Sequence, residues 1–203
     1  MKLELGSARF EARRIFCIGR NYALHAAELG NAKPAEPVVF MKPVTCLVAA
    51  GAPLPLPRGR GAVHHEAEVV LLLDGPKLAG VTLGLDLTLR EEQDRLKKGA
   101  LPWELAKCFD HSAPIGAFVA PDQLKLGMLG FEFRVGGQLR QSGNTADMLF
   151  PIPKILEFLA SRWTLLPGDL VFTGTPPGVA PVNAGDELML EAAGIGRFKW
   201  RCE

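Results

Sequence analysis

Residues 64–75 read HHEAEVVLLLDG, an apolar run with two glutamates at its head. The run predicts a buried strand, and side chains alternate between the two faces of a strand. Glu66 and Glu68 should therefore point to the same face, about 6.6 Å apart along the chain. Burying two like charges costs several kcal/mol unless one carboxyl is protonated or a cation lies between them. We favour the cation, and the alternative is a solvated strand edge.

A second strand pattern, residues 81–89, contributes a third acid. Leucines alternate in it with small or polar residues, and Asp86 is its only charge. The turn at residues 74–76 indicates that this strand returns beside the first. Glu66, Glu68 and Asp86 then form a three-carboxylate site, whose oxygen ligands select Mg²⁺ or Mn²⁺, with Ca²⁺ as a possible substitute. His64 and His65 are not needed as ligands, because the segment lacks the His-Glu-x-x-His spacing of a helical zinc site.

The length and the 48% hydrophobic content are those of one globular domain over residues 1–203, or at most of a domain with a small appendage. The 22 glycines and 16 prolines favour a strand-rich fold over a helical bundle. A net charge of +1 without a long basic run gives no reason to expect a nucleic acid or a membrane as partner. We expect a cytoplasmic protein, because the chain shows no membrane span or signal peptide, and reduced cysteines, because it has no Cys-x-x-Cys pair.

The rest of the chain alternates strand and turn patterns with two or three helices. Gly136-Gly137 predicts a tight hairpin turn within residues 130–141, followed by a polar loop at 142–145. Thr88 is the expected N-cap of a helix that ends at Gly99. Further helices are expected at 22–30 and 152–163, and further strands at 3–10, 14–19, 38–43, 114–118, 170–173, 187–191 and 197–200.

Four polar side chains are candidates for chemistry. His25 and Glu28 lie at i and i+3 of the expected helix, so the carboxylate could orient an imidazole that acts as a general base, although an exposed helical pair is the alternative. Lys42 closes an apolar run and either snorkels to the surface or points into an anion site. Lys107 lies among apolar residues, where an ammonium requires an acidic or anionic partner.

These pieces, in this order, resemble the fumarylacetoacetate hydrolase family, in its small acylpyruvase and oxaloacetate decarboxylase branch. The resemblance runs from about Ile15 to the C-terminus. The motifs that carry it are Gly19-Arg20-Asn21-Tyr22 with His25 and Glu28, Lys42-Pro43, His65-Glu66-Ala67-Glu68, Leu85-Asp86-Leu87-Thr88-Leu89-Arg90 with Gln93, Leu105-Ala106-Lys107, Leu139-Arg140-Gln141, and Thr173-Gly174-Thr175-Pro176-Pro177-Gly178-Val179.

The resemblance implies an α+β, predominantly β fold of rolled mixed sheets with a few short helices, in a homodimer. It implies Mg²⁺ or Mn²⁺ at the three carboxylates and a water-activating dyad of His25 and Glu28, with Lys107 beside the metal. The positions that it assigns to the substrate site are Arg20, Lys42, Arg90, Gln93 and Thr175.

The implied substrate is a small anionic 2-oxo acid that chelates the metal. Hydrolysis of an acylpyruvate or of fumarylpyruvate, or decarboxylation of oxaloacetate, would then break a carbon–carbon bond and release pyruvate as its metal-bound enolate. An isomerase of the 2-hydroxyhepta-2,4-diene-1,7-dioate type is the first alternative. A metal-stabilised binding protein without catalysis is the second.

Overall fold

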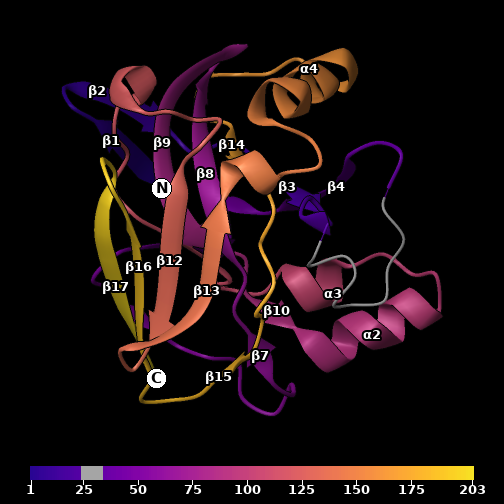
Figure 1. Ribbon diagram of the computed structural model, residues 1–203. Helices are drawn as coiled ribbons and strands as arrows, with labels where there is room; N and C mark the ends of the chain where they lie inside the picture. The colour runs from indigo at the N-terminus through magenta and orange to yellow at the C-terminus, as the bar shows by residue number, and fades with distance from the viewer. Residues whose placement is uncertain (24–33) are drawn as a thin grey trace.

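The computed structural model describes residues 1–23 and 34–203 of the chain. Strands dominate these residues and form curled mixed sheets with a few short helices beside them (Figure 1). The fold class predicted from the sequence, α+β and predominantly β, is confirmed.

The strands are β1 (Lys2–Leu5), β2 (Ala8–Glu11), β3 (Ile15–Gly19), β4 (Val38–Lys42), β5 (Leu47–Ala49), β6 (Pro53–Leu54), β7 (Val63–His64), β8 (Ala67–Asp74), β9 (Lys77–Leu85), β10 (Thr88–Leu89), β11 (Ala113–Ile115), β12 (Gly130–Val135), β13 (Gln138–Asn144), β14 (Leu170–Phe172), β15 (Pro181–Val182), β16 (Glu187–Ala192) and β17 (Gly196–Cys202). The α-helices of the described residues are α2 (Arg90–Lys98), α3 (Glu104–Lys107) and α4 (Ile152–Arg162).

The largest sheet has the strand order β4-β3-β14-β8-β9-β11-β5. Its β8 and β9 form an antiparallel hairpin that pairs Ala67 with Leu85 at the open end and Asp74 with Lys77 at the turn. Gly75 in that turn has a φ of 63°, a left-handed conformation that glycine adopts without steric cost. The predicted buried strand and its return are confirmed, and the acidic end of β8 lies at the open end of the hairpin.

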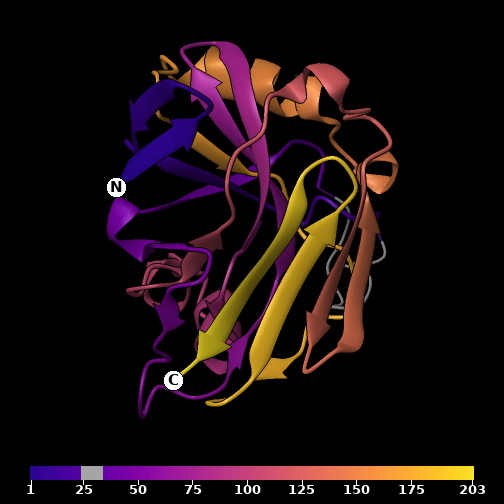
Figure 2. The same ribbon diagram turned by 90° about the vertical axis from the view of Figure 1, so that its left-hand side faces the viewer.

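Both faces of β8 are covered, which explains its continuous apolar sequence. Leu71 and Leu73 belong to the larger hydrophobic core, together with Phe133 of the five-stranded sheet. Val70 and Leu72 belong to a second, smaller cluster on the opposite face. Figure 2 shows the five-stranded sheet as a separate layer beside the large one. The hairpin is thus held from two sides, so the position of its open end is well determined.

The five-stranded sheet has the order β13-β12-β16-β17-β6. Gly136 and Gly137 have φ values of 55° and 80°, as the predicted tight turn between β12 and β13 requires. The polar loop expected at residues 142–145 is wrong in part, because β13 continues to Asn144, which pairs with Gly130. Polar side chains suit this strand because its edge is exposed.

The strand expected over residues 81–89 is interrupted at Asp86. β9 ends at Leu85, and β10 pairs with β7 in a separate three-stranded sheet. The N-cap expected at Thr88 is also wrong, because α2 begins at Arg90 and the Thr88 hydroxyl donates to the carbonyl of Asp86 at 3.0 Å. This break in the ladder lets the chain leave the sheet directly after Asp86.

Helices α2 and α3 contact β10 near the open end of the hairpin (Figure 1). Helix α4 confirms the prediction for residues 152–163 to within one residue. The helix expected at residues 22–30, with His25 and Glu28, falls almost wholly outside the described residues. The part of the chain that is described contains no helix long and apolar enough to cross a membrane.

Candidate metal centre

Three buried carboxylates meet at the open end of the β8–β9 hairpin. Glu66 precedes β8, Glu68 lies within it, and Asp86 follows β9 directly. The amide of Asp86 donates to the carbonyl of Glu66 at 2.8 Å, which brings the two segments together. One oxygen of each carboxylate lies within 4.8 Å of the others. The residues are 6%, 2% and 2% exposed, so the alternative of a solvated strand edge is wrong.

Lys107 bridges two of these carboxylates from the end of α3. Its ammonium donates to Glu66 Oε2 at 2.8 Å and to Asp86 Oδ2 at 2.6 Å. Burial lowers the pKa of Lys107, but the carboxylates of Asp86 and Glu66 raise it by more, so that the net pKa lies above its ordinary value. The acidic partner that the sequence required for this buried lysine is therefore present, and the ammonium is charged at neutral pH.

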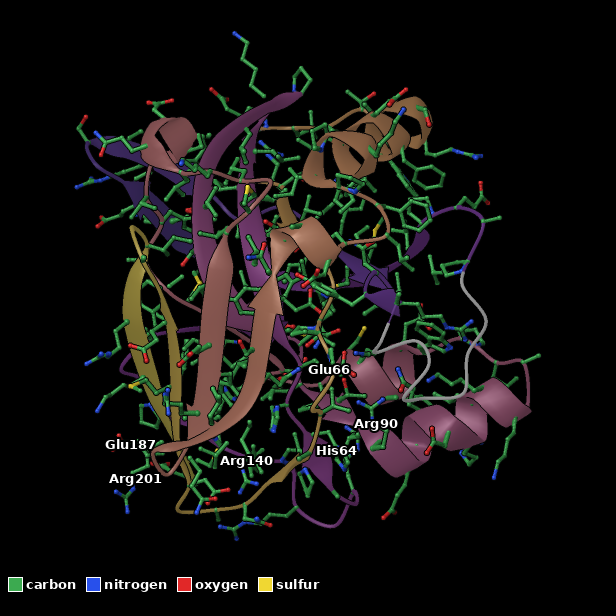
Figure 3. All side chains as sticks on the ribbon, viewed as in Figure 1. His64, Glu66, Arg90, Arg140, Glu187 and Arg201 are labelled. Atoms are coloured by element: carbon green, nitrogen blue, oxygen red, sulfur yellow. The ribbon has the colours of Figure 1, made fainter. Side chains whose placement is uncertain are left out.

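Arg90 binds the other oxygen of Glu66 from the first turn of α2 (Figure 3). Its guanidinium donates to Glu66 Oε1 at 2.6 Å and to Gln93 Oε1, three residues along the helix, at 2.6 Å. A planar guanidinium holds such partners in fixed directions. Gln93 and Glu66 are therefore oriented by the same side chain.

Lys42 is fully buried rather than at the surface, so the snorkelling alternative is wrong. Its ammonium donates to the carbonyl of Leu87 at 3.1 Å and to the carbonyl and hydroxyl of Ser112 at 2.6 and 3.0 Å. It also forms an ion pair with Asp86 Oδ1 at 2.7 Å. An ammonium has only three N–H donors, so these four oxygens occupy it fully.

Glu68 is held differently, by the backbone of the loop after β14. The amide of Gly174 donates to Glu68 Oε2 at 2.7 Å. Burial raises the pKa of Glu68 well above its ordinary value, and the charges of Asp86 and Glu66 raise it further, while the Gly174 amide lowers it. Gly174 has a φ of 101°, and a Cβ there would lie 2.6 Å from Cβ of Asn21. Only glycine fits this approach.

The donor set fits a divalent cation. Carboxylate oxygens are the ligands that Mg²⁺ and Mn²⁺ prefer, and three of them converge here from buried residues. Lys107, Arg90 and Lys42 compensate Glu66 and Asp86, whereas no cationic side chain among the described residues pairs with Glu68. The pKa of Glu68 is raised by its burial and, beyond that, by repulsion from Asp86 and Glu66. A hard cation between the three side chains would relieve it. The buried group of Glu66, Glu68 and Asp86 could therefore bind a divalent metal.

A small cavity of about 30 Å³ adjoins these carboxylates. Four of the five side chains expected at the substrate site line it, and Lys42 is not among the lining residues. Four further side chains that the sequence analysis did not single out also line the cavity, namely Ile18, Phe40, Lys97 and Trp103. The lining residues are Ile18, Gly19, Arg20, Phe40, Glu66, Glu68, Asp86, Arg90, Gln93, Lys97, Trp103, Lys107 and Thr175. The expected dyad of His25 and Glu28 lies outside the described residues.

Gln141 supports the site from β13. Its Oε1 accepts the amide of Ala67 at 3.0 Å and faces His65 Nδ1 at 2.8 Å, while its Nε2 donates to Thr175 Oγ1 at 2.8 Å. The Thr175 hydroxyl in turn donates to the carbonyl of Ala67 at 2.9 Å. Burial lowers the pKa of His65 to about 4, so its imidazole is neutral. This network joins the start of β8 to the loop that carries Gly174.

Known proteins are similar to this chain over most of their length. The chain is 39% identical to the mitochondrial oxaloacetate tautomerase FAHD1 of Bos taurus, with 94% of this chain and 92% of the relative covered. It is 39% identical to oxaloacetate tautomerase YcgM of Escherichia coli, with 88% of each covered. A crystal structure of fumarylpyruvate hydrolase from Pseudomonas aeruginosa in complex with Mn²⁺ and pyruvate superposes with a TM-score of 0.92 at 33% identity. That likeness covers 100% of this chain and 95% of the other.

The family model of the fumarylacetoacetate (FAA) hydrolase C-terminal domain matches residues 14–202. The match includes the acidic hairpin, both helices beside it and the Gly174 loop. Taken with relatives that are similar from end to end, it means that this chain belongs to the fumarylacetoacetate hydrolase family.

Proposed function

We propose that this protein catalyses enolate chemistry on a small 2-oxo acid, and that the keto–enol interconversion of oxaloacetate is its main reaction. The observation that carries the proposal is the group of three buried carboxylates bridged by Lys107 at the wall of a cavity. Lys107, with a divalent cation held by the three carboxylates, would stabilise negative charge that develops on a substrate oxygen beside them. The similarity to two oxaloacetate tautomerases supports the choice of substrate.

Glu66, Glu68 and Asp86 would hold the metal, Mg²⁺ or Mn²⁺ in our proposal. When bound, the ion would polarise the keto group and stabilise the charge of the enolate. Lys107 uses two of its three N–H donors on Glu66 and Asp86, so the third can meet a substrate oxygen. Lys42 is saturated with partners, and we assign to it the positioning of Asp86 in place of the substrate contact expected from the sequence.

The substrate carboxylate would lie against Arg90 and Gln93, which line the cavity and orient each other. Thr175 lines it too, but its hydroxyl proton is used by Ala67, so it can only accept a further hydrogen bond. The dyad of His25 and Glu28 stays a prediction. Its imidazole would take the proton from the carbon next to the keto group in tautomerisation, or from water in hydrolysis.

Carbon–carbon bond cleavage is the second candidate function. The Pseudomonas aeruginosa hydrolase with Mn²⁺ and pyruvate favours it, because pyruvate is the fragment that cleavage of an acylpyruvate leaves. Decarboxylation of oxaloacetate would produce the same enolate. The isomerase and the non-catalytic binding protein are the remaining alternatives.

Purified protein with Mg²⁺ should be assayed with enol-oxaloacetate, with fumarylpyruvate and acetylpyruvate, and with 2-hydroxyhepta-2,4-diene-1,7-dioate. We expect the fastest catalysed change to be the loss of enol absorbance without release of carbon dioxide. Glu68→Gln should abolish it, while Asp74→Asn, an exposed acid at the other end of β8, should not. Faster release of pyruvate from fumarylpyruvate would instead establish the second candidate, and no turnover of any 2-oxo acid would refute the proposal.

The expected homodimer, the single domain and the cytoplasmic location also stay predictions. The dimer can be checked by sedimentation equilibrium, which should return twice the chain mass of 21.9 kDa.

A further inference from the structure

Two cationic side chains at the cavity have no ion-pair partner among the described residues. Arg20 follows β3, and its Nε is buried without a hydrogen-bond partner. Lys97 lies in the last turn of α2, is half-buried, and lines the cavity. The neighbouring Lys98 is exposed, so helix α2 turns one lysine toward the site and the next toward solvent.

Arg20 and Lys97 both make cation–π contacts with Trp103. The guanidinium carbon of Arg20 lies 5.9 Å from the centre of a Trp103 ring, and Lys97 Nζ lies 5.7 Å from it. Gly19 lets the ring approach, because a Cβ there would lie 3.3 Å from it. Arg20 itself has a φ of 58°, an unusual conformation for a residue with a side chain. An aromatic ring thus attracts two cations to one side of the cavity without neutralising them.

The balance of charges around the cavity favours the binding of a second anionic group, in addition to the chelating end of the substrate. Four cationic side chains and three carboxylates line it. The carboxylates are already engaged with Lys107, Arg90 and the Gly174 amide, and a divalent metal would add further positive charge. Of the described residues that line the cavity, Arg20 and Lys97 are therefore the cations left to meet an anion that enters from outside.

We propose that Lys97, with Arg20 beside it on Trp103, binds the carboxylate at the far end of the substrate and makes the enzyme selective for dicarboxylic over monocarboxylic 2-oxo acids. This inference rests on the proposed function, since the near end of the substrate is taken to lie at the metal. It gives Lys97 the role of a specificity-determining residue.

The protonation of Lys97 gives this selectivity a pH dependence. Burial lowers the pKa of Lys97 to about 8, and Arg90 and Arg20 lower it while Glu66 and Asp94 raise it. Of these groups, Arg90 and Asp94 lie in α2, Glu66 directly precedes β8, and Arg20 directly follows β3. Lys97 carries its charge below pH 8 and loses it above. The preference for dicarboxylic acids should therefore fall as the pH rises through about 8.

The contribution of the far carboxylate to affinity can be measured by comparing the binding of two 2-oxo acids of equal length. 2-Oxoglutarate and 2-oxopentanoate share the chelating end and differ in one carboxylate against one methyl group. Calorimetry with the Mg²⁺-loaded protein should show roughly 10- to 100-fold tighter binding of 2-oxoglutarate at pH 7, the usual worth of a charge-assisted hydrogen bond. Lys97→Met keeps the apolar stem on Trp103 and should remove most of this preference, while Lys98→Met should leave it intact.

Lys97→Arg tests the charge itself, because its guanidinium stays protonated through the alkaline range. It should keep the preference and lose its decline around pH 8, and the kcat/KM for oxaloacetate should follow the same pattern. Equal binding of both acids by the unchanged protein, or a preference that survives in Lys97→Met, would overturn the inference. If neither acid binds, the proposed function fails, and the inference fails with it.

Discussion

Each of the three carboxylates is held by a different kind of partner. Glu66 meets a guanidinium and an ammonium, Asp86 meets two ammonium groups, and Glu68 meets only a backbone amide. The charge of Glu68 is therefore the least compensated within the described residues, in agreement with its raised pKa. A bound cation should depend most strongly on this side chain.

Substitution of Glu68 by glutamine should weaken Mg²⁺ and Mn²⁺ binding by more than about 100-fold, because the amide brings no charge to the centre. Calorimetry should find one site per chain in the unchanged protein. Asp86→Asn should act in the same direction, and Asp74→Asn, at the exposed end of the same hairpin, should have no effect. Unchanged affinity in both Glu68→Gln and Asp86→Asn would refute the metal assignment.

Lys107→Met should lower turnover of every substrate by roughly 10²- to 10³-fold, as expected when one donor to a developing oxyanion is removed. The Mg²⁺-bound variant should keep its fold, because the cation compensates the carboxylates that the lysine leaves. Steady-state kinetics together with circular dichroism would measure both effects. Lys98→Met is the matched control. If Lys107→Met kept the activity of the unchanged protein, Lys107 would have only a structural role.

Replacement of His25 by alanine should distinguish two kinds of chemistry. Hydrolysis of an acylpyruvate requires an activated water and should fall by roughly 10²- to 10⁴-fold, the usual contribution of a general base. Decarboxylation of oxaloacetate needs no attacking water and should fall much less. Both rates are to be measured on one preparation at saturating Mg²⁺. Equal losses would indicate a structural role, and no loss would indicate an exposed helical pair.

The sequence indicated site residues through charged side chains that lie in apolar segments. Glu66, Glu68, Asp86 and Lys107 could be predicted in this way, because a buried charge needs partners. Gln141 and Trp103 carry no such signal: a glutamine in a polar hairpin and a tryptophan in a short loop are ordinary there. Lys97 lies in a charged helix, where nothing in the sequence sets it apart from Lys98. Their roles arise only from the side to which the fold turns them.

At the scale of elements, the site depends on a hairpin and a loop that meet. The β8–β9 hairpin supplies the carboxylates, and the loop after β14 supplies the amide of Gly174. Asn21 fixes this loop, since its Nδ2 donates to the carbonyl of Thr173 at 2.8 Å. The position of Glu68 is therefore controlled from outside its own sheet pairing.

Gly174→Ala should both destabilise the protein and weaken the metal site. The new Cβ would meet Asn21 at 2.6 Å in a left-handed backbone, at a cost of about 2 kcal/mol or more in the free energy of unfolding. Displacement of the loop would also remove the amide from Glu68. Urea unfolding and Mg²⁺ calorimetry measure the two effects. Gly127→Ala, where no atom lies within 4 Å, is the control, and an equal effect there would contradict the argument.

Long patterned elements could be predicted from the sequence, and short ones could not. β8, α4 and the hairpin at Gly136-Gly137 follow from continuous apolar runs, helical spacing and turn residues. The end of β9 at Leu85 could not be predicted in this way. The alternation of leucines continues through residue 89, although the backbone changes its pairing partner from β8 to β7. A pattern records which side chains are buried, and it does not record which strand pairs with them.

At the scale of the molecule, the centre joins segments that are far apart in sequence. Gly174 lies 106 residues from Glu68, and Lys107 lies 41 residues from Glu66. A ligand that binds only this assembled arrangement stabilises the whole fold. The mixed sheets and their curvature were implied by the family resemblance, whereas composition alone indicated only a strand-rich fold.

Removal of the metal should therefore lower the melting temperature of the protein. A cation at 100 times its Kd adds about 2.7 kcal/mol of stability, which corresponds to roughly 5 to 10 °C for a chain of this size. Calorimetric scans with Mg²⁺ and with a chelator measure the difference. Asp86→Asn should abolish it, and a shift of the same size in that variant would show that the cation stabilises the protein elsewhere.

The open end of the β8–β9 hairpin also has a consequence for the order of folding. A hairpin that closes from its turn begins where Asp74 faces Lys77, a favourable pair, and finishes where Ala67 faces Leu85, beside three like charges. Repulsion therefore rises as the strands zip together and is greatest at the last step. Lys107 belongs to a later segment of the chain. Its hydrogen bonds to Glu66 and Asp86 stabilise the closed end of the hairpin once the strands have paired. We therefore predict that the end of the hairpin that carries the carboxylates frays first on unfolding, so that the candidate metal centre is the last part of the hairpin to form and the first to open.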